Sequence, residues 1–329
     1  MKKAIIAGER AVSLAEVPVP RPGANEALVK VHVAPMCTEY KSYLDGKPRD
    51  GLGHEAAGEV VRVGGPGPVK VGDRVVAMPL QACGECALCR SGHYIHCESN
   101  RMTDATMAQF VVKPAFLLQK IPDDVSYEQA SLACCGLGAS FGAIQNLALT
   151  AYDTLLITGL GPVGLGAVIN AKFVGARVIA LESNLYRQNL ARDLGADAVM
   201  DPADPDVSER IKELCGGAGP DAALDCSGAV AAHRLCIDAV RRKGKVAFVG
   251  ESSRETPITI SRDLLRKGLQ LIGSWHYNLN DFPKLMRVIQ TSPLVDRLIT
   301  HRFPMSRIGE AFERSVSQQC GKILLKPWE

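Results

Sequence analysis

The sequence predicts an α/β protein with two domains, one of them β-rich and the other built on a doubly wound parallel sheet. Its 329 residues exceed the roughly 100–200 residues of one ordinary domain. Up to about residue 135, short β-prone runs are separated by Gly and Pro. From about residue 150, apolar strands alternate with helical stretches. The two regions therefore follow different folding patterns.

The N-terminal region contains several short runs rich in Val and other β-prone residues. Proline and glycine interrupt these runs, as at Pro18, Pro20, Pro22 and residues 64–67, so the chain turns repeatedly over short distances. This pattern is typical of a compact β-barrel or sandwich. The expected strands are residues 3–6, 27–33, 58–63 and 73–77.

The second region begins with a continuous apolar run at residues 154–158, as expected for a strand that is buried on both faces. Helical stretches and further apolar runs follow in alternation. Repeated strand–helix units of this kind predict a parallel sheet with helices on both faces. The expected strands are residues 154–158, 177–181, 198–200, 222–225 and 245–249, and the expected helices are residues 163–174, 185–194, 207–215 and 233–240.

The composition excludes several classes of protein. Hydrophobic residues make up 47% and charged residues 22%, as in an ordinary globular protein. The net charge of +3, from 38 basic and 35 acidic residues, does not suggest a nucleic-acid partner. No stretch approaches the roughly 20 apolar residues of a membrane span, and the apolar run at residues 4–7 is too short for a signal peptide. We therefore expect a cytoplasmic protein, whose 11 cysteines favour metal binding over disulfides.

Four cysteines crowd into one stretch with the spacing C-x2-C-x2-C-x7-C, and Gly84 and Gly92 let the backbone turn there. Thiolates two residues apart in a tight loop can bind one metal ion, and a fourth thiolate completes a tetrahedron. This donor set predicts zinc, with an iron–sulfur cluster as the alternative. Because protein atoms would fill every position around the metal, we interpret the site as structural. Its candidate ligands are Cys83, Cys86, Cys89 and Cys97.

A looser set of metal-binding residue types lies outside that stretch. It consists of Cys37, the sequence Gly53-His54-Glu55 and the sequence Cys134-Cys135-Gly136. A catalytic zinc needs three protein ligands and one open position. A Cys, a His and a Cys from distant positions would meet that need, although each of them taken alone is more often an ordinary packed residue.

A glycine-rich turn follows the first buried strand of the second region. Residues 158–164 read T-G-L-G-P-V-G and contain G-x-G-x-x-G between a strand and a helix, which is the context of a dinucleotide-binding turn. Glu182 ends the next strand, where a carboxylate binds the adenosine ribose and repels a 2′-phosphate, so NAD is favoured over NADP, although Arg187 opposes this preference. The candidate cofactor-binding residues are Gly159, Gly161, Pro162, Val163, Gly164, Glu182 and Arg187.

Taken together, these residues resemble the zinc-containing medium-chain dehydrogenase/reductase family, which includes alcohol, sorbitol and threonine dehydrogenases. The resemblance covers essentially the whole chain, and the order of the landmarks and the double zinc pattern are specific to it. The landmarks are Cys37, Gly53-His54-Glu55, residues 71–75 (V-G-D-R-V), the four-cysteine stretch, Cys135-Gly136, residues 159–164 and Glu182.

The resemblance implies a GroES-like catalytic domain formed by residues 1–136 and 275–329, with a Rossmann domain, residues 137–274, inserted between them. It implies an enzyme that transfers a hydride from an alcohol to NAD, carries two zinc ions per chain and forms a homo-oligomer, either a dimer or a tetramer. The implied ligands of the catalytic zinc are Cys37, His54 and Cys135, with Glu55 close to the metal and Cys134 as the competing thiol.

One stretch departs from the family pattern. Relatives read Cys-x-Ser/Thr-Asp after the first ligand, whereas this chain reads Cys37-Thr38-Glu39-Tyr40, as though one residue were missing. We interpret Thr38 as the hydroxyl that passes the alcohol proton outward and Glu39 as standing in the aspartate's place. Without a deletion, Glu39 would stand where the hydroxyl belongs. Because the segment between Cys37 and His54 also looks short, we expect a wide pocket mouth and a secondary alcohol or polyol as substrate.

By the same family pattern, residues 104–108 reach the active site, and Met107 and Trp275 line the substrate pocket. Packing between domains is the alternative for these large side chains. Lys322 is interpreted as an ordinary surface lysine, with a role near the pyrophosphate as its alternative.

Three other functions are weighed against an alcohol dehydrogenase. A threonine-dehydrogenase-like enzyme would act on an amino alcohol through the same zinc site. A zinc-independent reductase of the superfamily would lack Cys37, His54 and Cys135 as a set, so their presence argues against it. A non-enzymatic zinc module that binds nucleic acid would need a basic surface, which the balanced charge does not favour.

Overall fold

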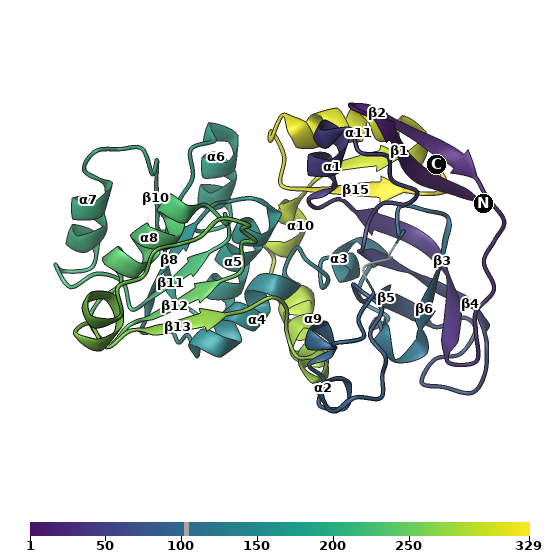
Figure 1. Ribbon diagram of the computed structural model, residues 1–329, viewed down its shortest axis with the longest axis horizontal. Coiled ribbons are helices and arrows are strands. Elements are labelled where there is room, and N and C mark those ends of the chain that lie inside the picture. The colour runs from purple at the N-terminus through teal and green to yellow at the C-terminus, as the bar shows by residue number, and fades with distance from the viewer. Residues whose placement is uncertain (102–104) are drawn as a thin grey trace. The chain divides into compact units, whose positions relative to one another are not determined.

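The computed structural model describes residues 1–101 and 105–329 and divides the chain into two units. Unit 1 is β-rich, and unit 2 contains a parallel sheet with helices, as Figure 1 shows. The predicted α/β fold class is therefore confirmed. Unit 1 comprises Met1–Cys135, Asn278–Thr291 and Ile299–Glu329, and unit 2 comprises Gly136–Tyr277 and Ser292–Leu298.

Unit 1 is built on a seven-stranded sheet in the order β14-β15-β3-β4-β5-β7, with β6 paired to β3, and on the separate hairpin β1-β2. All its strand pairs are antiparallel except β14 with β15. Buried Val and Ala side chains from β3, β4 and β5 form its core. The strands are β1 Lys2–Gly8, β2 Ala11–Glu16, β3 Glu26–Pro35, β4 Ala56–Val63, β5 Arg74–Ala77, β6 Phe110–Pro114, β7 Leu118–Lys120, β14 Ile299–Pro304 and β15 Lys322–Lys326; the helices are α1 Glu39–Asp45, α2 Ala87–Arg90, α3 Tyr127–Ser131, α9 Phe282–Thr291 and α11 Ile308–Val316.

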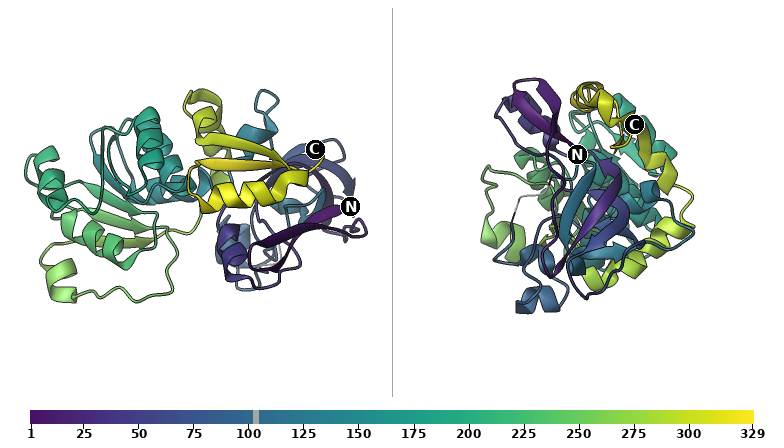
Figure 2. Two further views of the ribbon diagram at one scale, coloured as in Figure 1. Left: turned by 90° about the horizontal axis from the view of Figure 1, so that it is seen from above. Right: turned by 90° about the vertical axis from the view of Figure 1, so that its right-hand side faces the viewer.

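Unit 2 is built on a six-stranded sheet in the order β10-β9-β8-β11-β12-β13, in which every pair is parallel. Helices lie on both faces of this sheet (Figure 2). The chain runs outward from β8 in one direction and then from β11 in the other, so the order reverses between these strands, where ligands bind in such sheets. The strands are β8 Thr154–Thr158, β9 Arg177–Leu181, β10 Ala198–Met200, β11 Ala222–Asp225, β12 Lys245–Phe248 and β13 Gln270–Gly273; the helices are α4 Gly138–Leu147, α5 Pro162–Phe173, α6 Leu185–Asp193, α7 Val207–Leu214, α8 Val230–Ala239 and α10 Val295–Leu298.

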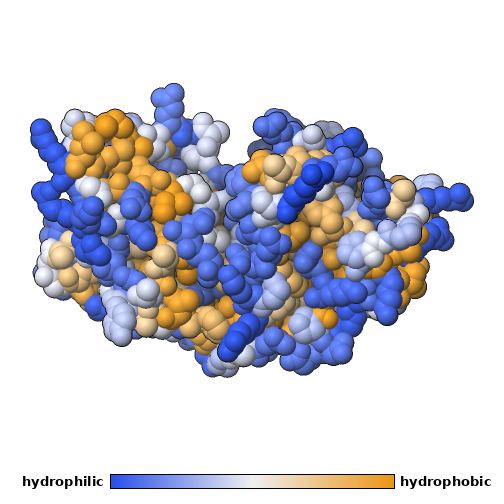
Figure 3. Space-filling view, turned by 90° about the horizontal axis from the view of Figure 1, so that it is seen from below, coloured by the Kyte–Doolittle hydropathy of each residue, from blue (hydrophilic) through white to orange (hydrophobic). Residues whose placement is uncertain are grey.

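The expected strands and helices of the second region agree with the structure to within a few residues, because long apolar runs are strong signals there. The sequence did not predict β14, β15 or α11, which follow residue 275. Among the described residues, no helix combines the length and apolar character that crossing a membrane requires. The face of the molecule in Figure 3 is mostly polar, with apolar patches between the polar side chains.

Candidate active site

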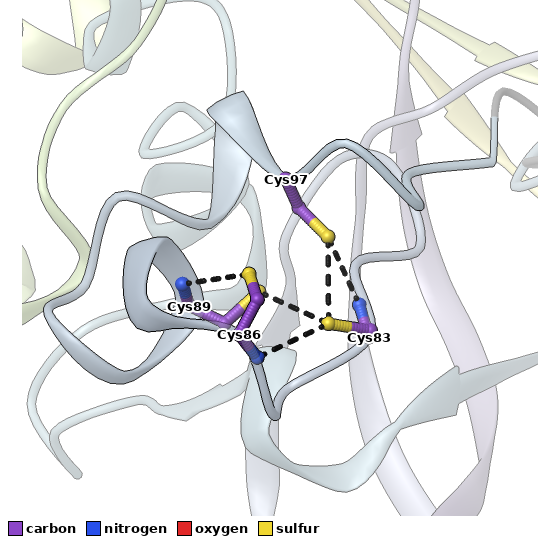
Figure 4. A group of neighbouring side chains, drawn as sticks. All are labelled: Cys83, Cys86, Cys89 and Cys97. Carbon is purple, nitrogen blue, oxygen red and sulfur yellow. Dashed lines mark hydrogen bonds between the residues drawn. The ribbon is translucent and has the colours of Figure 1, made fainter.

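The four cysteines of the predicted structural site lie together in one loop of unit 1, and their Sγ atoms are all within 4.8 Å of one another. The Sγ atom of Cys83 is 3.5 Å from that of Cys97 and 3.9 Å from that of Cys89, and Figure 4 shows the four side chains converging. Four thiolates around one zinc ion at about 2.3 Å would stand about 3.8 Å apart. The cluster therefore fits a tetrahedral zinc without rearrangement of the fold.

Backbone N–H groups support this cluster. The N–H groups of Glu85 and Cys86 both donate to the Cys83 Sγ atom at 3.4 Å. These hydrogen bonds lower the pKa of Cys83 to about 6, whereas burial raises the pKa of Cys89 to about 12. A loop that already stabilises a thiolate is suited to a metal that binds only the deprotonated form.

The second group of metal-binding side chains also assembles within unit 1, from three separate segments. Cys37 follows β3, His54 and Glu55 directly precede β4, and Cys135 follows α3. One donor atom from each of the four lies within 4.8 Å of the others, and His54 Nε2 is 3.2 Å from the Cys135 Sγ atom. Two thiolates and an imidazole are a donor set that zinc prefers, and three such ligands leave one position open.

The two thiols of this group have different acidities. The Cys135 side chain lowers the pKa of Cys37 well below its usual value, and Lys322 and His54 act in the same direction against the effect of burial. The Cys37 thiolate and burial in turn raise the pKa of Cys135. Cys134 is fully buried and donates a hydrogen bond to the Ala77 carbonyl, and it is absent from the group whose donor atoms converge.

Glu39 places its carboxylate beside His54. Its Oε1 atom is 3.0 Å from His54 Nδ1, and its Oε2 atom accepts a hydrogen bond from the Cys37 backbone N–H at 2.7 Å. Burial disfavours the charged carboxylate, but the hydrogen bonds from His54 and the Cys37 backbone outweigh burial, so the pKa of Glu39 is lowered. A carboxylate that binds the second nitrogen of a metal-binding His fixes the orientation of the imidazole ring.

Lys322 was wrongly interpreted as a surface residue. It is fully buried on β15, and its Nζ atom lies 2.6 Å from Glu55 Oε1, whose side chain is also fully buried. The other Glu55 oxygen accepts a hydrogen bond from the Cys135 backbone N–H at 3.1 Å. Burial raises the pKa of Glu55 to about 7 while the charge of Lys322 opposes that change. Residues 322–325 of β15 are all buried, so strand alternation does not distinguish an inward-facing Lys322, and no local sequence signal identified it.

The remaining residues that were predicted for the active site or the substrate pocket do not belong to either metal-binding group. Thr38 is exposed and starts α1 without capping it through its side chain. Met107 is fully buried in the core of unit 1, and Trp275, in unit 2, is 40% exposed. Asp104, part of the stretch that was expected to reach the active site, lies outside the described residues.

The glycine-rich turn joins β8 to α5 at the point where the strand order of unit 2 reverses. Gly159 has a φ of +81°, and a Cβ atom at Gly164 would lie 1.9 Å from the Gly159 carbonyl oxygen. A Cβ atom at Gly161 would meet no heavy atom within 4 Å, so the space beside the first turn of α5 is open. Pro162 and Val163 form that first turn. The turn thus fits a pyrophosphate against a helix N-terminus.

Glu182 lies at the end of β9 and connects to the same turn. Its Oε2 atom accepts a hydrogen bond from the Leu160 backbone N–H at 2.7 Å, and its Oε1 atom accepts one from Asn184 at 3.0 Å. The Ser183 hydroxyl also donates to Oε1, at 3.4 Å, whereas Oε2 has a second lone pair that could accept a ribose hydroxyl. Arg187 lies in the first turn of α6. The placement of Glu182 therefore suits an adenosine ribose without a 2′-phosphate.

Comparison with known proteins identifies the family. Residues 23–123 match the alcohol dehydrogenase GroES-like domain, and residues 162–291 match the zinc-binding dehydrogenase family. The chain is 34% identical to L-threonine 3-dehydrogenase of Symbiobacterium thermophilum, over 96% of this chain and 94% of that one. It is 30% identical to sorbitol dehydrogenase of Bombyx mori, over 98% and 97% of the two chains.

A solved structure shows the same fold. The alcohol dehydrogenase of Escherichia coli CFT073, complexed with the cofactor NADH, superposes with a TM-score of 0.88 at 26% identity, over 99% of both chains. Because the zinc-binding dehydrogenase and GroES-like models both match and dehydrogenases of at least 30% identity cover nearly the whole chain, the protein belongs to the zinc-containing medium-chain dehydrogenase/reductase family and is a zinc-dependent, NAD-linked alcohol oxidoreductase.

Proposed function

We propose that the enzyme oxidises a secondary alcohol or polyol to the ketone, transferring the hydride to NAD and releasing one proton. The observation that carries this proposal is the convergence of Cys37, His54, Glu55 and Cys135, whose donor atoms lie within 4.8 Å of one another. The similarity to sorbitol and L-threonine 3-dehydrogenases supports a secondary carbon as the reacting centre. The short segment between Cys37 and His54 supports a pocket that admits a branched carbon.

In this proposal each side chain of the site has one role. When bound, zinc lowers the pKa of an alcohol, and NAD accepts the hydride. Cys37, His54 and Cys135 hold the metal, and Glu39 orients the His54 ring through the 3.0 Å contact with Nδ1. Lys322 neutralises the buried Glu55 carboxylate, which would otherwise add a charge beside the two thiolates.

A substrate panel with zinc analysis tests the proposed reaction. We expect two zinc ions per chain and NADH formation that is fastest with secondary alcohols or polyols, measured by absorbance with 2,3-butanediol, sorbitol and L-threonine beside ethanol. L-threonine is included because the 34% identity to L-threonine 3-dehydrogenase favours an amino alcohol as the second candidate. A primary alcohol as the best substrate would contradict the proposed pocket, and one zinc or none after supplementation would contradict the second metal site.

Thr38 is the proposed carrier of the alcohol proton. It directly follows Cys37 in the chain, and it is exposed, so its hydroxyl can pass a proton to solvent. We expect Thr38→Val to lower the oxidation rate about a hundredfold, the typical effect of a lost proton-transfer group, with NADH binding unchanged. Thr38→Ser retains the hydroxyl and is the matched control. Near-wild-type rates for Thr38→Val at every pH would contradict this role and would make Glu39 or Tyr40 the next candidate for the proton-transfer residue.

Glu182 is the proposed determinant of coenzyme choice. Its carboxylate at the end of β9 disfavours a 2′-phosphate, so wild-type enzyme is expected to have a higher kcat/KM with NAD than with NADP. Glu182→Ser should reduce that preference by roughly tenfold, which is the effect of about 1.4 kcal/mol. A wild-type preference for NADP would show that Arg187 outweighs the carboxylate.

We further propose that the enzyme works in the cytoplasm as a homo-oligomer, a dimer or a tetramer. Strand β13 is an edge of the six-stranded sheet. The segment before it exposes three large apolar side chains, Ile258, Ile260 and Leu265. Exposed apolar surface of this kind is typical of protein–protein contacts. Analytical ultracentrifugation of the wild type and of Leu265→Glu measures the mass directly, and a wild-type monomer would contradict the proposal.

A further inference from the structure

A buried polar network lies at the edge of unit 2 that carries the glycine-rich turn. Its centre is Asp225, the last residue of β11, which is fully buried. The Oδ1 atom of Asp225 accepts hydrogen bonds from the hydroxyls of Thr158 and Ser227, at 2.8 and 2.7 Å, and its Oδ2 atom accepts one from the Gly228 N–H at 2.9 Å. One carboxylate thus joins the end of β8 to the turn after β11.

The same residue also reaches the end of β12. The Asp225 carbonyl oxygen accepts the N–H groups of Val249 and Gly250, at 2.9 and 3.1 Å. A Cβ atom at Gly228 would lie 2.2 Å from the Glu251 carbonyl oxygen, so the turn after β11 packs directly on the segment after β12. Three neighbouring parallel strands therefore end in loops that share Asp225.

His233, on the first half of α8, extends this network to a more distant part of the segment after β12. Its Nε2 atom lies 3.2 Å from Asp225 Oδ2, although no hydrogen bond joins the two atoms. Its Nδ1 atom lies 2.6 Å from the Thr256 hydroxyl. The ring packs edge-on against Phe248 and is only 7% exposed. The imidazole thus bridges a buried carboxylate and a loop hydroxyl.

Only a few contacts hold residues 250–259 against the rest of unit 2 among the described residues. Most residues of this segment are exposed, whereas Thr256 is half-buried against His233. Arg234 adds a longer contact to the Pro257 carbonyl at 3.4 Å, and Asp263 accepts the Thr259 N–H at 2.8 Å. Exposed segments with few buried contacts open at low free energy, so a single hydrogen bond between such a segment and a buried ring has a large effect on the order of the segment.

We propose that His233 is a positioning residue for the dinucleotide. Through Asp225 and Thr256 it holds the turn after β8, the turn after β11 and residues 250–259 in one arrangement before the cofactor binds. Gly159, whose Cβ atom would lie 2.6 Å from the Ser227 Cβ atom, directly contacts this network. Loops that are already ordered lose less entropy when a ligand binds. The inference rests on the proposed binding of NAD at this edge of the sheet.

The test compares Thr256→Val with Thr256→Ser. Val keeps the β-branched shape and removes the hydroxyl, whereas Ser retains the hydroxyl. We expect Thr256→Val to weaken NADH binding to the zinc-loaded protein roughly three- to tenfold, measured by fluorescence titration, because one hydrogen bond is lost. Hydrogen exchange of residues 250–259 in the cofactor-free protein should become faster in the same variant. Thr256→Ser should match the wild type in both measurements.

Two substitutions of His233 separate positioning from plain stability. His233→Asn places a nitrogen near the Nδ1 position and should keep residues 250–259 protected, whereas His233→Gln reaches toward Asp225 and should not. Thr291→Val, which removes a helix-surface hydroxyl in unit 1, is the matched control and should leave NADH binding unchanged. Equal losses for the two His233 variants, in proportion to their melting temperatures, would overturn the proposal.

Gly161→Val distinguishes this inference from the assignment of the cofactor site. A side chain at Gly161 would occupy the open space beside α5 and should abolish NADH binding. If Gly161→Val binds NADH normally, the cofactor lies elsewhere, and both the site and the role of His233 are wrong. If Gly161→Val loses binding while Thr256→Val retains wild-type affinity and exchange, only the role of His233 is wrong.

Discussion

The two metal-binding clusters of unit 1 hold similar donor atoms but have different surroundings. The four cysteines come from one loop, residues 83–97, and backbone N–H groups contact their sulfur atoms. The other cluster draws Cys37, His54, Glu55 and Cys135 from three separate segments, and charged side chains surround it. In the local loop, backbone N–H groups support the thiolates, whereas the assembled cluster depends on the fold and on a second layer of ionisable groups.

The charges explain the difference. Zinc with four thiolates has a net charge of −2, which solvent can stabilise because Cys83 is exposed. Zinc with two thiolates and an imidazole is neutral, and Lys322 at 2.6 Å offsets Glu55, so the Glu39 carboxylate beside His54 is the one charge that remains. A buried site has to be nearly neutral because unpaired buried charges are costly. The assembled cluster, in which Glu55 and Lys322 are fully buried, is therefore nearer to neutral than the loop cluster.

The largest expected effect comes from His54→Ala, which removes a ligand of the assembled cluster. We expect alcohol oxidation to fall by at least about a thousandfold, since the zinc contribution to such reactions amounts to several kcal/mol. Zinc content should fall from two ions per chain to one, while the melting temperature changes little. A His54→Ala protein that retains both zinc ions would show that the two clusters do not differ in this way.

Cys89→Ser is the corresponding change in the loop cluster. Loss of a structural metal belongs to the few single changes that cost roughly 4 kcal/mol or more of folding stability. We expect a clearly lower midpoint in thermal unfolding, with the residual folded enzyme retaining its kcat. Cys215→Ser, at a half-buried cysteine of unit 2 outside both clusters, is the matched control. An unchanged midpoint for Cys89→Ser would contradict a structural role.

Lys322→Met tests the charged layer around the assembled cluster. It leaves the Glu55 carboxylate buried without its cation, which typically costs about 3–5 kcal/mol. The double variant Lys322→Met/Glu55→Gln removes both charges and should recover part of that loss. Additive losses in the double variant would show that the two side chains do not stabilise each other.

In protein freed of the catalytic zinc, we expect the destabilisation caused by Lys322→Met to depend on pH. The pKa of Glu55 is about 7 with Lys322 present, and it rises further without that cation. A carboxyl group whose folded pKa is raised destabilises the folded state as pH rises from its unfolded value, near 4.3, to its folded value. The difference in melting temperature between wild type and Lys322→Met should therefore widen above about pH 7. A constant difference between pH 6 and 9 would contradict the pairing.

The sequence predicted the local features well and the long-range ones poorly. The spacing of the four cysteines, the glycine-rich turn and the buried strands of unit 2 each occupy one stretch of chain, so a pattern of neighbouring residues identifies them. Lys322 contacts a residue 267 positions away, and a lysine is seldom fully buried, so no local pattern indicates its role. Only tertiary pairing places β15 beside β3 and brings Lys322 to Glu55.

The role of Glu39 follows from the family pattern and the structure taken together. The departure after Cys37 left open whether Glu39 replaces the hydroxyl or the aspartate of the family pattern. In the structure its carboxylate contacts both the His54 ring and the Cys37 backbone N–H, while Thr38 is exposed. This geometry supports orientation of the ring by Glu39, and Thr38 remains the proposed proton carrier.

Glu39→Gln is the smallest of these changes and the most specific. Gln is nearly isosteric and keeps a hydrogen-bond acceptor, but it removes the charge beside His54 Nδ1. Loss of such a partner typically weakens metal affinity 10–100-fold, so we expect zinc to leave the assembled cluster at a lower chelator concentration, while the loop cluster retains its ion.

Glu85→Gln is the matched change in the loop cluster. Glu85 contacts Cys83 only through its backbone N–H, which the substitution leaves in place, so its chelator titration should match the wild type. Release of both ions at the same chelator concentration in Glu39→Gln would contradict a charged layer that is specific to the assembled cluster. Equal sensitivity of the two Glu→Gln variants would show that side-chain charge supports both clusters, and the contrast between a backbone-supported loop and a charge-supported assembly would fail.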